Sequence, residues 1–247
     1  MDSNTLLWIT TIIMVAGGLA ILLVGKRRTP SEEMQTVLHG IVPIIAACSY
    51  LAMATGQGLV MLPTNTPGMG RIFYFARYID WAFTTPLLLL SLGLTAMHAG
   101  PKRMGAITGI VLADVMMIIT SFIFSASEVP WMKWSWFIIS CIAFLGVYYV
   151  IWVSFLQANR LEREDTQSSY RRNALILSVL WLIYPVVLAV APDGLGIISD
   201  TASVLFIAIL DVLAKVVYGL MATLSDAKTS DIDLAGETTR PTLRKVA

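Results

Sequence analysis

The sequence predicts an all-α fold, a bundle of seven membrane-spanning helices, and three observations point to this fold class. Hydrophobic residues make up 57% of the 247-residue chain and charged residues only 13%, whereas soluble domains carry about 25% charged residues. Seven apolar stretches are long enough to cross a bilayer, which takes about 20 helical residues. Lipid satisfies no backbone hydrogen bonds, so helices are favoured over open sheets.

The apolar stretches follow one another with little sequence between them. We predict spans at 5–25, 36–57, 72–94, 105–125, 132–156, 173–191 and 201–224. The first is interpreted as a span because no basic residues precede it, as they would in a cleaved signal. Residues 56–70 are rich in Gly, Pro, Thr and Asn, which favours a loop with a short hairpin. Pro-Asp-Gly at 192–194 predicts a turn between the last two spans.

Basic residues are distributed unevenly between the two ends of the predicted bundle. One end has Lys26, Arg27, Arg28, Lys102, Arg103, Arg160, Arg163, Arg171, Arg172, Lys228, Arg240, Arg244 and Lys245. The other end has only Arg71 and Lys133. Excess basic charge marks the cytoplasmic side, which predicts an external N-terminus and a cytoplasmic C-terminus in the cell membrane. We expect one membrane domain, residues 1–225, and a disordered polar tail, residues 226–247.

Five ionisable residues lie inside the predicted spans: Arg77, Asp80, Asp114, Asp211 and Lys215. A charge at the bilayer centre costs about 2.5–3.5 kcal/mol on insertion scales, so such residues usually face the interior and mark a pathway. Asp211 and Lys215 are one turn apart on one helix face. A structural ion-pair network is the alternative, but several buried charges are a costly way to hold helices together. A buried lysine beside carboxylates favours a covalent cofactor or a proton relay.

Three motifs resemble those of microbial rhodopsins of the bacteriorhodopsin type. They are RYIDWAFTTPLLLL at 77–90, WLIYP at 181–185 and LDVLAK at 210–215. Their order and the predicted topology also agree, and the resemblance covers residues 5–225. It implies a retinal protein in which Lys215 binds all-trans retinal covalently, as a protonated Schiff base. Such a protein is a light-driven transporter or photoreceptor and not an enzyme.

The resemblance also implies roles for individual residues. Asp80 and Asp211 would be the counterion, with Asp80 accepting the proton and Thr84 hydrogen-bonded to Asp80. Arg77 would keep the outward path positive, and Tyr50 and Tyr184 would hydrogen-bond Asp211. The implied retinal pocket includes Trp81, Thr85, Leu88, Met117, Trp181 and Tyr184. Taken alone, each aromatic residue is better explained by core packing.

Some positions depart from the bacteriorhodopsin pattern. Ser91 replaces the carboxylic acid that returns the proton, so we expect reprotonation from the cytoplasm without a carboxylic acid donor, along a path that includes His39. Alternatively, His39 is an interfacial residue without a transport role. Asp193 matches one carboxylate of a proton-release pair. Asp200 either substitutes for the second carboxylate or caps the last helix.

Within the family, the residues favour a light-driven outward proton pump. The resemblance implies that a chloride pump would lack Asp80. Inward pumps resemble the chain less, because they have proline in place of Asp211. A sensory rhodopsin that signals to a transducer is the alternative, although Ala214 stands where sensory rhodopsin II has a threonine needed for signalling. Expected partners are the lipid bilayer and further copies of the chain, as a trimer or pentamer; neither nucleic acid nor metal is expected.

Overall fold

The computed structural model describes residues 2–63 and 70–239, and within them seven helices are long and apolar enough to cross a membrane. The first four are α1 (Ser3–Val24), α2 (Pro30–Ala54), α3 (Phe75–Ala96) and α4 (Met104–Ala126). The fifth runs through α5 (Pro130–Tyr149), η1 (Val150–Phe155) and α6 (Leu156–Asn159), and the sixth is α7 (Glu164–Val190). The seventh runs through α8 (Asp200–Asp211), η2 (Val212–Val217) and α9 (Tyr218–Thr239). The predicted seven-helix fold of a multi-pass membrane protein is confirmed.

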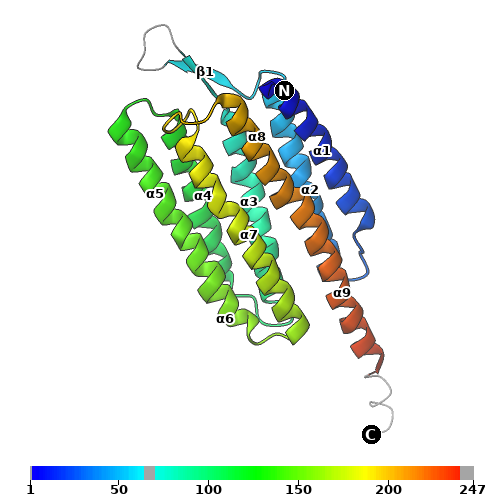
Figure 1. Cartoon of the computed structure of the whole chain (residues 1–247). Coiled ribbons are helices and arrows are strands. Elements are labelled where there is room, and N and C mark those ends of the chain that lie inside the picture. Colours follow the sequence, from blue (N-terminus) through cyan, green and yellow to red (C-terminus); the bar gives the residue numbers. More distant parts are fainter. Residues whose placement is uncertain (1, 64–69, 240–247) are drawn as a thin grey trace.

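The helices pack side by side, with the start of α1 and the end of α9 at opposite ends of the bundle (Figure 1). The predicted hairpin is present, because β1 (Val60–Pro63) pairs antiparallel with β2 (Gly70–Phe73). It lies at the same end as the N-terminus, which we call the hairpin end. We call the opposite end, where α9 ends, the basic end. That the basic end faces the cytoplasm stays a prediction.

Polar side chains cap several helices where the chain leaves a loop. Asp2 accepts a hydrogen bond from the Thr5 amide at the start of α1, which satisfies a free N–H of the first turn. Ser199 does the same for α8 by accepting from the Ala202 amide. Asp200 is therefore not the cap, as one sequence-based alternative held. It is instead the first residue of the helix.

The bundle has an apolar outside and a partly polar inside. Large aliphatic residues such as Leu23, Leu112 and Leu145 are exposed on the outer surface, where a soluble protein would expose charges. Asp80, Asp211 and other polar residues are buried between the helices. This distribution suits a protein whose outer surface contacts lipid.

The seventh span contains a short π-helix, η2, which includes Lys215. Single π-helical turns inside α-helices often occur at functional sites. Two neighbouring helices also have irregular hydrogen bonding, because Pro86 lies inside α3 and Pro185 inside α7, and proline lacks the backbone donor. These three irregularities lie on the helices that surround Lys215.

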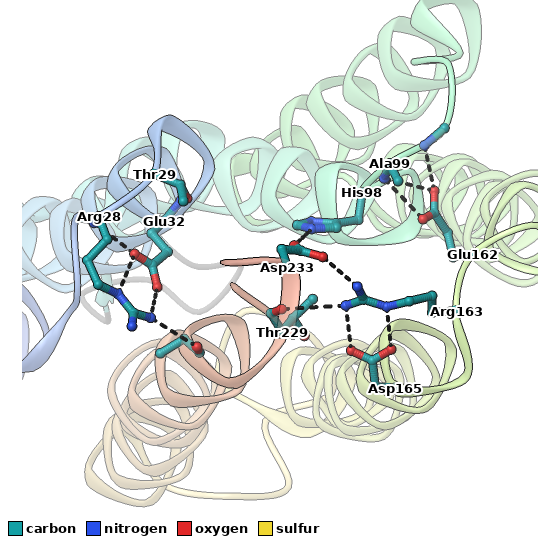
Figure 2. Close-up of polar contacts among 12 residues, drawn as sticks. Arg28, Thr29, Glu32, His98, Ala99, Glu162, Arg163, Asp165, Thr229 and Asp233 are labelled. Carbon is teal, nitrogen blue, oxygen red and sulfur yellow. Dashed lines mark hydrogen bonds and ion pairs between the residues drawn. The ribbon is translucent and has the colours of Figure 1, made fainter. Parts of the chain in front are cut away.

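Helix α9 continues beyond the predicted end of the seventh span. The sequence predicted a disordered tail from residue 226, but the chain is helical to Thr239. Asp233 pairs with Arg163 at 2.5 Å and with His98 at 2.8 Å (Figure 2). Asp231 pairs with Arg28. These ion pairs join the last turns of α9 to basic residues in the loops of the basic end. Residues 240–247 lie outside the described part of the chain.

Candidate functional site

Lys215 lies buried between two carboxylates in the middle of the bundle. Its Nζ atom donates to Oδ2 of Asp80, which is on α3. The same Nζ atom lies 3.3 Å from Oδ1 of Asp211, which is on the same membrane span as Lys215. All three residues are 2% exposed or less. A buried ammonium needs such partners, because an unpaired charge is costly away from water. The three residues that the sequence predicted to interact are therefore in contact.

The two carboxylates have different surroundings. Asp211 accepts hydrogen bonds from Tyr50 at 2.8 Å, from Tyr184 at 2.7 Å and from Trp81 at 3.3 Å. Both tyrosine bonds were predicted, whereas the Trp81 bond was not. Asp80 Oδ1, in contrast, is buried without a partner among the described residues. Asp211 is thus held by three side-chain donors, whereas Asp80 keeps one carboxylate oxygen unpartnered in the described chain.

Thr84 and Arg77 lie on the same helix as Asp80. The Thr84 hydroxyl donates to the Asp80 main-chain carbonyl at 2.9 Å, so the implied bond to the carboxylate stays a prediction. Arg77 is buried with its Cζ atom 5.2 Å from the centre of the Tyr74 ring. Its Nε atom has no partner among the residues that the structure describes. Arg77 thus places an unsatisfied positive group on the hairpin side of Asp80.

An apolar cavity adjoins Lys215, and it encloses about 700 Å³ with its open side included. The residues predicted for the retinal pocket all line it, namely Trp81, Thr85, Leu88, Met117, Trp181 and Tyr184. Ligand pockets are mostly apolar with few polar groups, and the lining of this cavity has that character. The two charged lining residues, Asp211 and Lys215, are in contact with each other, which suits a mostly apolar molecule that is attached at one end.

Asp114 and Thr85 form a second buried polar pair beside this cavity. The Thr85 hydroxyl lies 2.7 Å from Asp114 Oδ2 and 2.8 Å from the Trp81 carbonyl. No cation is recorded on Asp114, and its Oδ1 atom is unpartnered in the described chain. A buried carboxyl and a hydroxyl are therefore in direct contact at this side of the cavity.

Asp193 lies at the hairpin end beyond Arg77. It forms an ion pair with Arg71 at 2.6 Å, and Arg71 also pairs with Glu128 at 2.7 Å. Burial raises the pKa of the Asp193 carboxyl, while the positive charges of Arg77 and Arg71 oppose that rise. A carboxyl in this position can hold a proton at a higher pH than an exposed aspartate.

Asp200 has different partners from Asp193. It accepts hydrogen bonds from Tyr74 at 2.9 Å and Ser3 at 2.7 Å, whereas Asp193 is bound to Arg71. The structure does not bring the two carboxylates into direct contact. The suggested replacement of a paired release site by Asp193 and Asp200 is thus not supported by a hydrogen bond.

His39 is the centre of a polar network between Lys215 and the basic end. It is 1% exposed, so its ring faces the interior of the bundle, and its role in transport stays a prediction. Its Nε2 atom lies 2.7 Å from Ser91 Oγ, and its Nδ1 atom lies 3.2 Å from Thr223 Oγ1. Ser91 donates in turn to Gln35 Oε1 at 2.7 Å. With Thr223 as donor to Nδ1, this set of bonds suits a neutral imidazole.

An apolar layer separates this network from Lys215. Leu88, one turn before Ser91 on α3, and Ala214, next to Lys215, belong to one buried apolar cluster. A continuous hydrogen-bonded chain from His39 to Lys215 is not recorded among the described residues. Proton movement between them therefore requires a transient rearrangement or added water.

Two polar residues of the basic end were missed by the sequence analysis. Gln35 lies one turn before His39, just outside the predicted second span, and bonds Thr95 at 3.1 Å. Asp226 lies eleven residues after Lys215, which is about three turns on the same helix face. Its Oδ2 atom is buried without a partner in the part of the chain that the structure describes. Helical spacing from His39 and Lys215 was the signal that would have identified both.

The fold and site define a class of protein: a seven-helix membrane protein with a lysine between two carboxylates at an apolar cavity. A family model described as "Bacteriorhodopsin-like protein" matches residues 1–229, and the chain belongs to this family. Archaerhodopsin-2 from Halobacterium sp. (strain aus-2) is 34% identical over 238 residues, with 95% of this chain and 88% of that protein covered. Family membership implies a retinal chromophore, which the apolar cavity at Lys215 fits.

Solved structures support the same assignment. The thermophilic rhodopsin from Rubrobacter xylanophilus gives a TM-score of 0.86 at 35% identity, with 94% of this chain and 99% of that chain covered. The light-driven proton pump LR (Mac) from Leptosphaeria maculans gives a TM-score of 0.83 at 32% identity, with 92% and 97% covered. Both similarities extend over nearly the whole bundle.

Proposed function

We propose that the protein is a light-driven outward proton pump that binds all-trans retinal covalently at Lys215. The observation that carries the proposal is the contact of Lys215 with Asp80, whose second carboxylate oxygen is unpartnered in the described structure. A similar solved structure is titled a light-driven proton pump. The site is built for transport across a membrane and not for turnover of a diffusing substrate.

Lys215 would hold retinal, which would supply light absorption and a light-driven change of shape at the Lys215 nitrogen. The chain's own residues then move the proton. Asp80 receives it, because Asp211 is already bound by three donors. Arg77 and Asp193 lead from Asp80 to the hairpin end, where the buried Asp193 carboxyl can exchange a proton. Outward transport follows if this end is external, as the basic residues predict.

The proton returns to the Lys215 nitrogen from the basic end. The position next to the apolar layer is Ser91 and not a carboxylic acid. A serine hydroxyl does not give up its proton at neutral pH. The network of Ser91, His39 and Thr223 supports a path from the basic end. Histidine can take part in proton transfer near neutral pH. In this proposal the protein lies in a lipid bilayer and associates with further copies of itself as a trimer or pentamer.

Two substitutions test the proposed site. Lys215→Ala should abolish the visible band formed with all-trans retinal, because the attachment point is lost. Asp80→Asn should keep a coloured protein but abolish the transient deprotonated form after a flash, because the acceptor is lost. Time-resolved absorption of purified protein measures both, with Asp231→Asn, an exposed acid at the basic end, as the control. A native visible band in Lys215→Ala would exclude the attachment site, and an unchanged flash response in Asp80→Asn would exclude the acceptor.

The sensory alternative predicts a different outcome. A sensor needs a long-lived signalling state and a partner, and it moves no net charge during continuous light. Ala214 favours the pump because sensory rhodopsin II has a threonine at that position. A photoproduct that lasts many seconds without a pH change would favour the sensor.

A further inference from the structure

A polar cavity lies near the basic end and is distinct from the apolar cavity at Lys215. It encloses about 280 Å³ with its open side included. Gln35 and Thr95 line it, and Gln35 is hydrogen-bonded to Ser91. Glu32, His98 and Asp226 are the titratable groups in its lining. The cavity therefore joins the His39–Ser91 network to acidic and basic side chains of the basic end.

Two of these three titratable groups already have ionic partners. Glu32 pairs with Arg28 at 2.6 Å and also accepts from the Arg28 amide at 2.8 Å. His98 pairs with Asp233 at 2.8 Å (Figure 2). The Asp226 residue keeps part of its surface exposed, but its Oδ2 atom is buried and has no hydrogen-bond partner among the described residues. Asp226 is thus the acid in this cavity that is not already held by a cation at hydrogen-bond distance.

The charged groups around Asp226 leave its carboxylate poorly compensated. Arg172 of α7 attracts it, and Glu32 of α2 repels it. The Arg172 guanidinium is itself hydrogen-bonded to Asn173 at 3.2 Å. Tyr218, about two helical turns before Asp226 on α9, interacts electrostatically with the same carboxylate. Burial of an unpaired carboxylate oxygen is costly, and a proton on Asp226 removes that cost.

A short path connects Asp226 to the network around His39. Thr223 lies three residues before Asp226, one turn away on the same face of α9. Its hydroxyl contacts His39 Nδ1 at 3.2 Å, and His39 Nε2 contacts Ser91 at 2.7 Å. These side chains lead from the polar cavity toward the apolar layer beside Lys215. Asp226 stands at the outer end of this path.

We propose that Asp226 is the proton-holding acid of the basic end, which passes its proton inward through Thr223, His39 and Ser91 toward the Lys215 nitrogen. The inference rests on the proposed proton-pump function, and it replaces the expected reprotonation without a carboxylic acid donor by reprotonation from an acid at the basic end. In this step the O–H bond of the Asp226 carboxyl breaks and an N–H bond forms at Lys215. The Asp226 carboxylate then takes a proton from water at the basic end, so protons balance and nothing is oxidised.

The kinetic test compares Asp226→Asn with Asp226→Glu and a matched control. Asp226→Asn should slow the return of the proton to Lys215 by about tenfold or more, in the range of general-acid effects. A small permeant acid such as azide should restore the rate. Asp226→Glu should stay within about threefold of the parent, because it keeps the acid. Asp231→Asn, an acid of the same helix that pairs with Lys26 and Arg28 at the surface, should leave the rate unchanged.

A second measurement needs no retinal. Infrared spectra of the retinal-free protein should contain a protonated-carboxyl band that disappears in Asp226→Asn and shifts in Asp226→Glu. A wild-type band that persists in Asp226→Asn, together with an unchanged proton-return rate, would overturn the role of Asp226. A failure of the proposed function looks different: the parent protein itself would form no deprotonated state after a flash.

Discussion

At the residue scale, the site depends on an asymmetry between two carboxylates that share one lysine. Asp211 is bound by Tyr50, Tyr184 and Trp81, whereas Asp80 has an unpartnered oxygen within the described chain. Sequence alone identified both acids as ionisable residues inside predicted spans. The spacing of Asp211 from Lys215 also put those two residues on one helix face. The sequence did not predict the Trp81 bond, which depends on how the indole ring is turned. Contacts between helices require the packed structure.

Asp193 gives a residue-scale prediction about pH. Arg71 is one of the cations that oppose the burial-induced rise in the Asp193 pKa. Arg71→Gln removes that opposition, so the Asp193 pKa should rise further. The Asp193 carboxyl should then stay protonated to a higher pH than in the parent protein.

Infrared titration measures this shift, with the Asp193 band assigned through its loss in Asp193→Asn. The control is Arg27→Gln, which removes a cation at the basic end, far from Asp193 at the hairpin end. A band that titrates at the same or a lower pH in Arg71→Gln would contradict the electrostatic account of the hairpin end.

At the element scale, the ends of the spans were the part that the sequence predicted least well. The predicted second span began at 36 and excluded Gln35, and the seventh ended at 224 and excluded Asp226. Hydropathy falls at helix ends, where polar residues face loops and each other and not lipid. The helices continue because capping and ion pairs stabilise those turns, as Asp233 with Arg163 does for α9. The centres of the spans were predicted well because lipid contact dominates there.

Close packing of α1 against η2 gives an element-scale prediction. A Cβ atom at Gly17 would lie 2.4 Å from Val216 Cγ1 and 3.0 Å from Val216 Cβ. Valine has little χ1 freedom, so Gly17→Ala should displace the π-helix that carries Lys215. Overpacking of this kind costs about 1–3 kcal/mol, and the temperature of thermal bleaching should fall.

The matched control is Gly109→Ala in α4, where an added Cβ meets nothing within 4 Å. This change should leave the bleaching temperature equal or slightly higher, because alanine favours helix over glycine. Equal bleaching temperatures for Gly17→Ala and the parent protein would show that η2 tolerates the contact.

At the scale of the whole molecule, the proposed proton route runs along the bundle. Asp193 and Arg77 lie toward the hairpin end, Lys215 and its carboxylates lie between them and the basic end, and His39 with Asp226 leads to the basic end. The family and the fold follow from the sequence motifs and are confirmed by the comparisons. The direction of transport depends on which end is outside, and the distribution of basic residues predicts the hairpin end.

The direct measurement is the sign of the light-driven pH change in a suspension of intact cells that express the protein with retinal. In unbuffered medium, illumination should acidify the medium, a protonophore should abolish the change, and Asp80→Asn cells should show none. Acidification would support outward proton transport from the basic end to the hairpin end. Alkalinisation abolished by the protonophore, or no pH change from a fully coloured protein, would contradict it.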